Sequence, residues 1–391
     1  MGRTHNSSGN NQYKPCSPDN LIKDHLCLYF SIGRSDVEIV DLLKSHYDTQ
    51  HYRMRSVISV HLHETEEGKD QHDKWGPRFG LWFHNSLDAM SAWNNWLKVW
   101  WTNSNPRLIA KYFLDCCHEM KGVPMMTQSD PGTENNGVAN IQTTIRHRLD
   151  PSLCDTLQHR FMRKKNNVKS EANWSIFCHD FAPGFETILE DAEFTFSTVS
   201  LVFRWLAIPW IQAELDSWVF QCNFTAPRAD KNKILPHGVP ALIRSNPSRF
   251  GSLDFKILVP DHLFDEMEAK YAPPDHPVFQ LTPEPFDQRA NIYYESMGCP
   301  QVNLSTFWTV YQDLLQQFQS GPTGDELEEL LGSLHITTEQ ISQGDLIEVL
   351  PLKKLHAGDR MVGVIEGTIA VGSFSAPMTD SSSESDTEES E

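Results

Sequence analysis

The sequence predicts a mixed α/β fold, in which helices flank a five-stranded sheet and a helical extension follows. Three observations support this prediction. Strand-like and helix-like hydrophobic patterns alternate between residues 56 and 190, as in a sheet whose strands are joined by helices. Hydrophobic residues make up 39% of the 391 residues, enough for a sizeable core. Beyond residue 190, a long apolar segment and later helical patterns predict the extension.

The chain before the predicted sheet is first polar and then helical. Residues 1–18 are rich in Asn, Ser, Gly and Pro, and we expect them to be disordered. Residues 19–55 carry apolar residues at helical spacing on both sides of Gly33. They predict two short helices, which form either a helical hairpin or a helix-turn-helix.

The predicted core, residues 56–190, begins with three strands. We expect the first strand at 57–62, where Val and Ile predominate, and a charged loop after it. Segments 79–83 and 96–101 are apolar and aromatic, and a Ser- and Asn-bearing connection separates them. This pattern predicts a hairpin.

Helices and strands then alternate. Pro106 opens a helix that Gly122 ends, and a short strand at 123–127 leads to Asp130. The remaining elements of the core are a helix at 135–149, a strand at 156–162 and a helix at 166–181. The order of three strands followed by helix, strand, helix, strand and helix is that of an RNase H-like fold.

The rest of the chain is predicted to be an extension and an acidic tail. Pro209 interrupts the apolar segment 194–220, which predicts two buried helices that meet near this proline. The other elements expected in the extension, residues 191–320, are a strand at 254–259 and helices at 262–271 and 304–318. A small β-prone region is expected within 321–376, and residues 377–391 form an acidic, serine-rich tail that we expect to be disordered.

The net charge of −19 argues against a nucleic-acid partner, but this charge is unevenly distributed. Residues 321–391 contain 15 acidic and 3 basic residues, a net charge of −12, which leaves −19 + 12 = −7 for the first 320. Lys and Arg gather in segments 141–170 and 225–250, which suits phosphate contacts, although a solvated surface would look similar. The residues expected to contact nucleic acid are Arg160, Arg163, Lys164, Lys165, Lys169, Arg228, Lys231 and Lys233.

Several classes of protein are excluded by what the sequence lacks. The eight cysteines form no CxxC pair, which argues against a zinc ribbon and favours a reducing compartment. No apolar run is long enough to span a membrane, so we expect a soluble intracellular protein. The sequence also has no Walker-type phosphate loop, HExxH, GxSxG or GxGxxG motif.

Three acidic segments are candidates for a metal site. Asp130, in SDPGTEN, follows a predicted strand, where a metal ligand is held rigidly; Asp-Pro-Gly is also a common turn sequence. Glu171 lies in the second turn of a predicted helix, where a solvated side chain is the alternative. Asp70 and Asp73, in KDQHDKW, are either ligands or part of a charged surface loop.

The sequence resembles the DDE integrase core proteins annotated in fungal genomes, which are related to retroelement integrases and transposases. The resemblance covers roughly residues 70–240. It rests on DQHDKW, FGLWFH, WWTNSNPRLIAKYFLD, SDPGTENN, the Lys-Ser-Glu-x-x-Trp pattern, FAPGFE, FRWLAIPWIQAELDSWV and DKNKILPHGVP. In such families the first Asp lies in the first strand, the second just after the fourth strand, and the Glu on the following long helix.

Carried over to this sequence, the resemblance implies that Asp70, Asp130 and Glu171 bind Mg²⁺ or Mn²⁺ and catalyse phosphodiester hydrolysis and strand transfer. It also implies DNA as a partner and a nuclear location, and it allows a homo-oligomer. The charged segment before Asp70 departs from the apolar strand of the family, so Asp73 and Asp88 remain alternatives. A domesticated or decayed integrase that binds nucleic acid or protein without catalysis is the alternative function.

Overall fold

The computed structural model describes residues 66–72, 74–162, 168–189, 198–228, 236–252, 254–320 and 345–352. All of them belong to one structural unit. The predicted mixed α/β class is confirmed. The elements predicted before residue 66, and the tail expected at 377–391, lie outside the described residues.

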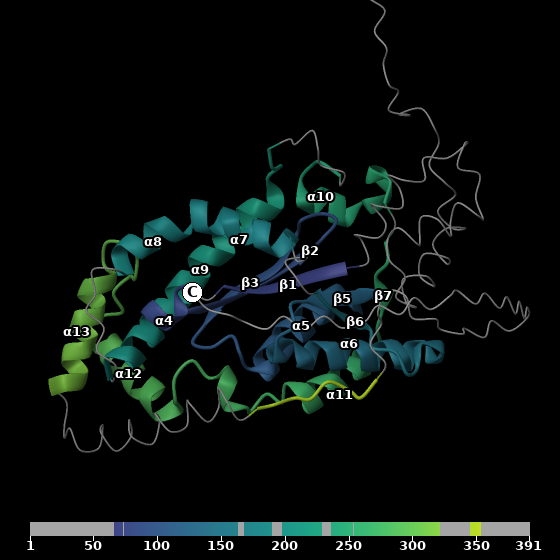
Figure 1. The fold of residues 1–391 in the computed structure, drawn as a ribbon. Helices are drawn as coiled ribbons and strands as arrows, with labels where there is room; N and C mark the ends of the chain where they lie inside the picture. Colours follow the sequence, from purple (N-terminus) through teal and green to yellow (C-terminus); the bar gives the residue numbers. More distant parts are fainter. Residues whose placement is uncertain are drawn as a thin grey trace, which may run out of the picture. The chain divides into compact units, whose positions relative to one another are not determined.

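A five-stranded mixed sheet has the order β3-β2-β1-β5-β6 (Figure 1). Strand β1 is antiparallel to β2, and β2 to β3, whereas β1, β5 and β6 are parallel. The strands are β1 (Glu66–His72), β2 (Trp82–Asp88), β3 (Asn94–Trp100), β5 (Met126–Ser129) and β6 (His159–Phe161). A separate antiparallel pair consists of β4 (Gly122–Val123) and β7 (Ile257–Leu258).

Strand β1 corrects one sequence prediction. The charged segment that contains Asp70 was expected to be a loop, but its residues EEGKDQH form a strand of the sheet. Both edges of β1 are paired, one with β2 and the other with β5. Strand formation depends more on such pairing than on intrinsic propensity, which explains how a strand can contain Glu, Lys and Asp. The strand expected at 57–62 lies outside the described residues.

Helices cover both faces of the sheet (Figure 1). One face carries α7 (Val168–Asp180), α8 (Ala182–Leu189) and α9 (Thr198–Phe224), and the other carries α5 (Pro106–Met120), α6 (Asn136–Leu149) and α11 (Asp261–Tyr271). The remaining helices are α4 (Gly76–Phe79), α10 (Pro240–Ser245), α12 (Glu284–Ser296) and α13 (Phe307–Ser320), with 3₁₀ turns η1 (Thr133–Asn135), η2 (Pro151–Leu153), η3 (Pro247–Phe250) and η4 (Pro277–Phe279).

Helix α9 also differs from the prediction. Two helices were expected to meet near Pro209, but α9 continues through this proline as one helix of 27 residues. A proline inside a helix removes one backbone hydrogen bond. The loss is offset by burial, because Ile208, Trp210 and Ile211 are all in the hydrophobic core. No helix in the described part of the chain is long and apolar enough to cross a membrane.

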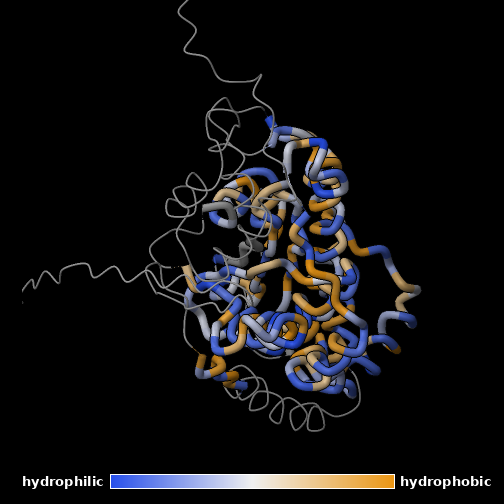
Figure 2. Tube along the Cα trace, turned by 90° about the vertical axis from the view of Figure 1, so that its right-hand side faces the viewer, coloured by the Kyte–Doolittle hydropathy of each residue, from blue (hydrophilic) through white to orange (hydrophobic). Residues whose placement is uncertain are grey.

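A hydrophobic cluster lies on each side of the sheet. The first joins Phe83, Phe177 and Leu206, from β2, α7 and α9. The second joins Trp96 of β3 to Phe113 of α5, with α6 and α11 contributing further residues. Hydrophobic and hydrophilic residues alternate along the helices in Figure 2, as expected of helices with one buried side.

Helix α6, which follows Asp130, packs closely on α5. A Cβ at Gly137 would lie 2.7 Å from the carbonyl oxygen of Pro106, so a larger residue would force the two helices apart. Helix α5 begins at this proline, and the Asn105 side chain caps it by accepting a hydrogen bond from the Arg107 backbone N–H. These contacts fix the start of α6 relative to the sheet.

Candidate carboxylate site

Asp130 directly follows β5 and precedes a turn. Its backbone carbonyl accepts hydrogen bonds from the Ser129 hydroxyl, at 2.9 Å, and from the Gly132 backbone N–H, also at 2.9 Å. The neighbouring strand adds a third constraint, because the Met162 backbone N–H donates to the Ser129 carbonyl at 2.7 Å. The main chain at Asp130 is therefore held in place at the end of the sheet.

A buried histidine links β5 to β6 just before Asp130. His159 Nδ1 lies 2.8 Å from the Thr127 hydroxyl, and His159 Nε2 lies 3.0 Å from the Ser129 hydroxyl. Ser129 gives its hydroxyl hydrogen to the Asp130 carbonyl, so Nε2 is the histidine nitrogen that donates. The sequence alone does not reveal this role of His159, because the histidine becomes a neighbour of Ser129 only through strand pairing.

Glu171 is placed by the aromatic residues of its helix. Phe177 is fully buried, and its ring centroid lies 5.1 Å from that of Phe83 on β2. Closer to Glu171, the Asn173 side chain donates a hydrogen bond to the Asn94 side chain at 2.8 Å. Helix α7 thus packs on β1 and β2, while the Glu171 side chain itself is exposed.

The Asp130 and Glu171 carboxylates interact electrostatically. Burial raises the pKa of the Asp130 carboxyl above its ordinary value, and the negative charge of Glu171 raises this pKa further. Two like charges that repel each other in a partly buried position destabilise the ionised protein. A cation between them would relieve that repulsion.

Asp130→Asn is therefore expected to stabilise the protein at neutral pH. The raised pKa means that the folded state disfavours the ionised carboxyl. Ionised Asp130 therefore lowers the free energy of unfolding at pH values above its folded pKa. This destabilisation disappears as the pH falls through the folded pKa and the carboxyl becomes protonated. The expected gain is about 0.5–1 kcal/mol, because solvent screens a partly exposed group. Urea unfolding at neutral and acidic pH measures it. The gain should shrink in a Glu171→Gln background and vanish in acid; an equal gain at all pH values would contradict the repulsion.

Strand pairing brings the backbone of Asp70 close to that of Asp130. In the antiparallel pair Asp70 lies opposite Asn85, and in the parallel pair its predecessor Lys69 lies opposite Ser129, the predecessor of Asp130. The structure describes the backbone of β1 and not its side chains. Asp70 and Asp130 thus occupy corresponding positions on neighbouring strands.

The two alternative first carboxylates differ in their surroundings. Asp88 ends β2, and its side-chain oxygens accept hydrogen bonds from the Met90 and Ser91 backbone N–H groups and from the Ser91 hydroxyl. Its carboxylate therefore stabilises the turn between β2 and β3. Asp73 lies outside the described residues.

Buried polar groups that the sequence did not reveal lie close to these carboxylates. Asn85 is fully buried, and within the described part of the chain neither of its side-chain polar atoms has a hydrogen-bond partner. The same holds for Gln128 Oε1 and for the Ser170 hydroxyl, which directly precedes Glu171. Strand register puts Asn85 and Gln128 on one face of the sheet, the face that α7 covers. Buried polar atoms normally have a hydrogen-bond partner, so these atoms have capacity to bind water, an ion or a ligand.

One predicted basic residue lies beside this site. Arg160 on β6 pairs with Gln128 on β5, so it belongs to the same face of the sheet, where it is partly exposed. Arg228 is exposed and lies beyond the end of α9. Lys169 lies in α7, and the structure describes only its backbone. The remaining predicted contacts, Arg163, Lys164, Lys165, Lys231 and Lys233, lie outside the described residues.

Comparison with known proteins identifies no relative of this chain. No family model matches the sequence, and no curated protein or solved structure is significantly similar to it. Among the described side chains, no group of three or more His, Cys, Asp and Glu is arranged to hold a metal ion. That set contains Asp130 and Glu171 but not the side chain of Asp70. A functional conclusion therefore depends on the arrangement of the strands and of the carboxylate pair.

Proposed function

We propose that this chain is an integrase- or transposase-like protein with an RNase H-like core, and that it acts on DNA by metal-dependent phosphodiester hydrolysis and strand transfer. The proposal includes Asp70, Asp130 and Glu171 as the ligands of Mg²⁺ or Mn²⁺. The observation that supports it most directly is the electrostatic interaction between Asp130 and Glu171. Asp130 follows β5 and Glu171 lies on α7, and both of these elements contact β1, the strand that carries Asp70.

The order and direction of the elements support the RNase H-like assignment. The strands of the large sheet and their main helices follow one another as β1, β2, β3, α5, β5, α6, β6 and α7. The types of element follow one another in the expected order, but the first strand is β1 and not the segment 57–62, which lies outside the described residues. Asp70 belongs to the central strand, Asp130 follows the adjacent parallel strand, and Glu171 lies on the next long helix, as in the family that the sequence resembles.

The residues at this site suit a hard divalent cation. Mg²⁺ prefers carboxylate oxygens, and two such groups lie close enough here for one to raise the pKa of the other. The orphaned amide of Asn85 and the side-chain oxygen of Gln128 supply further polar atoms nearby. When bound, the metal would activate the attacking oxygen and stabilise the leaving oxygen of the phosphodiester.

The protein's own residues would bind and orient the substrate. Ser129 and His159 hold the main chain of Asp130, while the aromatic packing of α7 positions Glu171. Arg160, at the edge of the same sheet face, would contact a DNA phosphate.

Calorimetric titration of the full chain with Mg²⁺ and Mn²⁺ tests this function. We expect binding in the wild type and none in an Asp130→Asn, Glu171→Gln double variant that remains folded. Asp180→Asn, which changes an exposed carboxylate on α7, is the matched control and should bind the metal normally. If the folded wild type bound neither metal, the enzymatic proposal would be wrong. In that case the protein would be a derivative that binds nucleic acid or protein without catalysis.

A further inference from the structure

Three aromatic side chains form an exposed patch where the end of α9 meets the connection between β2 and β3. Phe220 and Phe224, one helical turn apart on α9, are 62% and 50% exposed, and their rings are stacked with centroids 4.5 Å apart. Trp93, from the connection, packs against Phe224 in a T-shaped arrangement at 5.8 Å. We call these three side chains the aromatic patch. Aromatic rings usually contribute to a core, so a contiguous exposed group of them indicates a surface that binds a partner.

Hydrogen bonds connect the aromatic patch to the candidate carboxylate site. Asn94 and Asn223, each next in sequence to a member of the patch, bind each other twice. The Asn94 backbone N–H donates to the Asn223 side-chain oxygen at 2.8 Å, and the Asn223 amide donates to the Asn94 carbonyl at 3.0 Å. The Asn94 side chain also accepts the hydrogen bond from Asn173, which lies two residues beyond Glu171 on α7. One asparagine thus joins the patch to the helix that carries Glu171.

A basic residue lies over the aromatic patch. The Arg244 guanidinium, from α10, lies 5.0 Å from the centre of the Trp93 ring, and its Nη1 donates to the Asn95 side chain at 2.6 Å. Within the described residues, Arg244 forms no ion pair with a carboxylate. A guanidinium has five N–H groups, so the remaining ones can bind a phosphate. A second cation, Arg228, is exposed four residues beyond Phe224.

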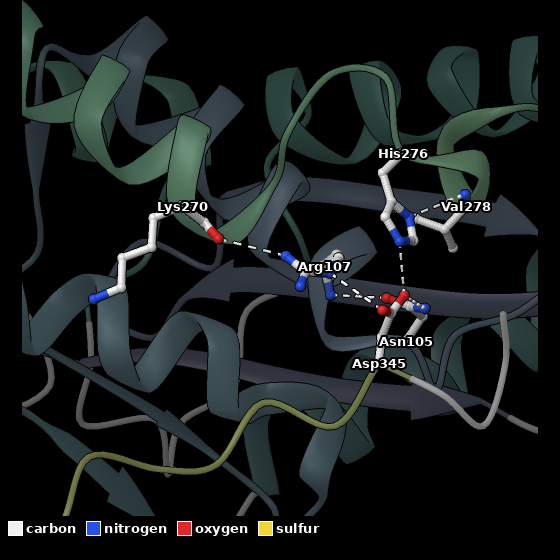
Figure 3. Close-up of polar contacts among 6 residues, drawn as sticks. All are labelled: Asn105, Arg107, Lys270, His276, Val278 and Asp345. Atoms are coloured by element: carbon white, nitrogen blue, oxygen red, sulfur yellow. Dashed lines mark hydrogen bonds and ion pairs between the residues drawn. The ribbon is translucent and has the colours of Figure 1, made fainter.

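On the other side of the sheet, cations of α5 and α6 are already paired with carboxylates. Arg107 Nε lies 3.4 Å from Asp345 Oδ1, and Arg107 Nη1 donates to the Lys270 carbonyl (Figure 3). Two further ion pairs join α5 and α6 to α11, namely Lys111–Glu268 at 2.8 Å and Arg148–Glu266 at 2.9 Å. A phosphate would have to displace these carboxylates. The charges therefore favour the side of α7, α9 and α10 for a nucleic acid.

We propose that the aromatic patch and Arg244 bind an unpaired stretch of the DNA strand whose phosphodiester is held at Asp130 and Glu171. This inference rests on the proposed function for the choice of DNA. Exposed aromatic rings stack on bases, and a base offers its flat face to a protein only when it is outside the stack of a duplex. The exposed Asp216, one turn before Phe220, repels phosphates. The strand backbone is therefore expected at the Arg244 side of the patch.

Fluorescence anisotropy of a labelled oligothymidine, measured with the full chain in EDTA, tests the proposal. EDTA removes divalent cations, so the affinity does not depend on a metal at the carboxylates. The Kd for the single strand should be at least about tenfold lower than for the same strand annealed to its complement. Phe224→Ala should raise this Kd at least about fivefold, because the stack with one base is lost. Phe224→Leu should bind as weakly as Phe224→Ala, whereas Phe224→Trp should keep the affinity of the wild type.

The phosphate contact is tested separately through the salt dependence of binding. Arg244→Gln keeps an amide that can donate to Asn95 but removes the charge. The slope of log affinity against log salt concentration should become shallower by about 0.7, the value for one phosphate contact on a single strand. Ile292→Ala, which changes a 63% exposed residue on α12, is the matched control and should leave both affinity and slope unchanged. Circular dichroism confirms that the variants are folded.

A folded wild type that binds no single strand would overturn the proposal, as would equal affinities of Phe224→Ala and Ile292→Ala. Full affinity in Phe224→Leu would also overturn it, because the patch would then bind an apolar partner rather than bases. The Asp130→Asn, Glu171→Gln double variant separates this inference from the proposed function. It should lose metal binding and bind the strand in EDTA at least as tightly as the wild type. A wild type that binds the strand but no metal would refute the catalytic function and leave the patch as a site for unpaired DNA.

Discussion

Replacing Asp70 by asparagine is expected to abolish Mg²⁺ and Mn²⁺ binding and to lower DNA cleavage and strand transfer by at least about 100-fold. The reason is the position of this residue on the central strand, one residue beyond the pairing of Lys69 with Ser129. A carboxylate at that position would complete a set of three with Asp130 and Glu171. Asparagine keeps the shape of the side chain but removes its charge. Calorimetry and a gel assay with a labelled DNA duplex measure the two effects.

The alternative first carboxylates serve as controls for Asp70. Asp88→Asn should leave metal binding intact and lower thermal stability slightly, because the Asp88 carboxylate is engaged in the turn that follows β2. Asp73→Asn should change neither property. Retention of metal binding in Asp70→Asn, with loss in Asp73→Asn, would show that the ligand is three residues further along the chain.

The sequence predicted those elements for which the hydrophobic pattern and the residues at the ends indicate the same type of secondary structure. Pro106 and the apolar face after it predict α5 correctly, and the strand before Asp130, expected at 123–127, is found at Met126–Ser129. Strand β1 could not be predicted in this way. Its seven residues EEGKDQH have neither apolar alternation nor strand propensity, and only pairing on both edges makes them a strand.

The candidate site likewise contains residues that the sequence identified and residues that it did not. Asp130 and Glu171 were identified by position on predicted elements, and they interact electrostatically in the structure. Asn85 and Gln128 were not identified, because an isolated polar residue in a strand normally marks an exposed face. Both are buried instead, on the face of the sheet that α7 covers. Their position follows from how the strands pair and from which helix covers them, and neither can be inferred from one sequence segment.

Among the substitutions proposed here, Phe177→Ala is expected to lower the free energy of unfolding most. The Phe177 side chain is fully buried, and its ring contacts those of Phe83 at 5.1 Å, Phe181 at 5.4 Å and Trp174 at 5.5 Å between centroids. Truncation removes these contacts and leaves a cavity between α7 and β2, which typically costs about 3–5 kcal/mol. Because α7 carries Glu171, metal affinity should fall as well, under conditions in which the variant is still folded.

The neighbouring residue Ile176 is the matched control. It lies on the same helix but is 49% exposed, so Ile176→Ala should change the free energy of unfolding by no more than about 0.5 kcal/mol and leave metal binding unchanged. Phe177→Leu should recover part of the stability and most of the metal affinity, because leucine still fills the space between α7 and β2. Equal losses in Phe177→Ala and Ile176→Ala would mean that α7 is not anchored through Phe177. The positioning of Glu171 would then depend on the Asn173–Asn94 hydrogen bond near the start of the helix.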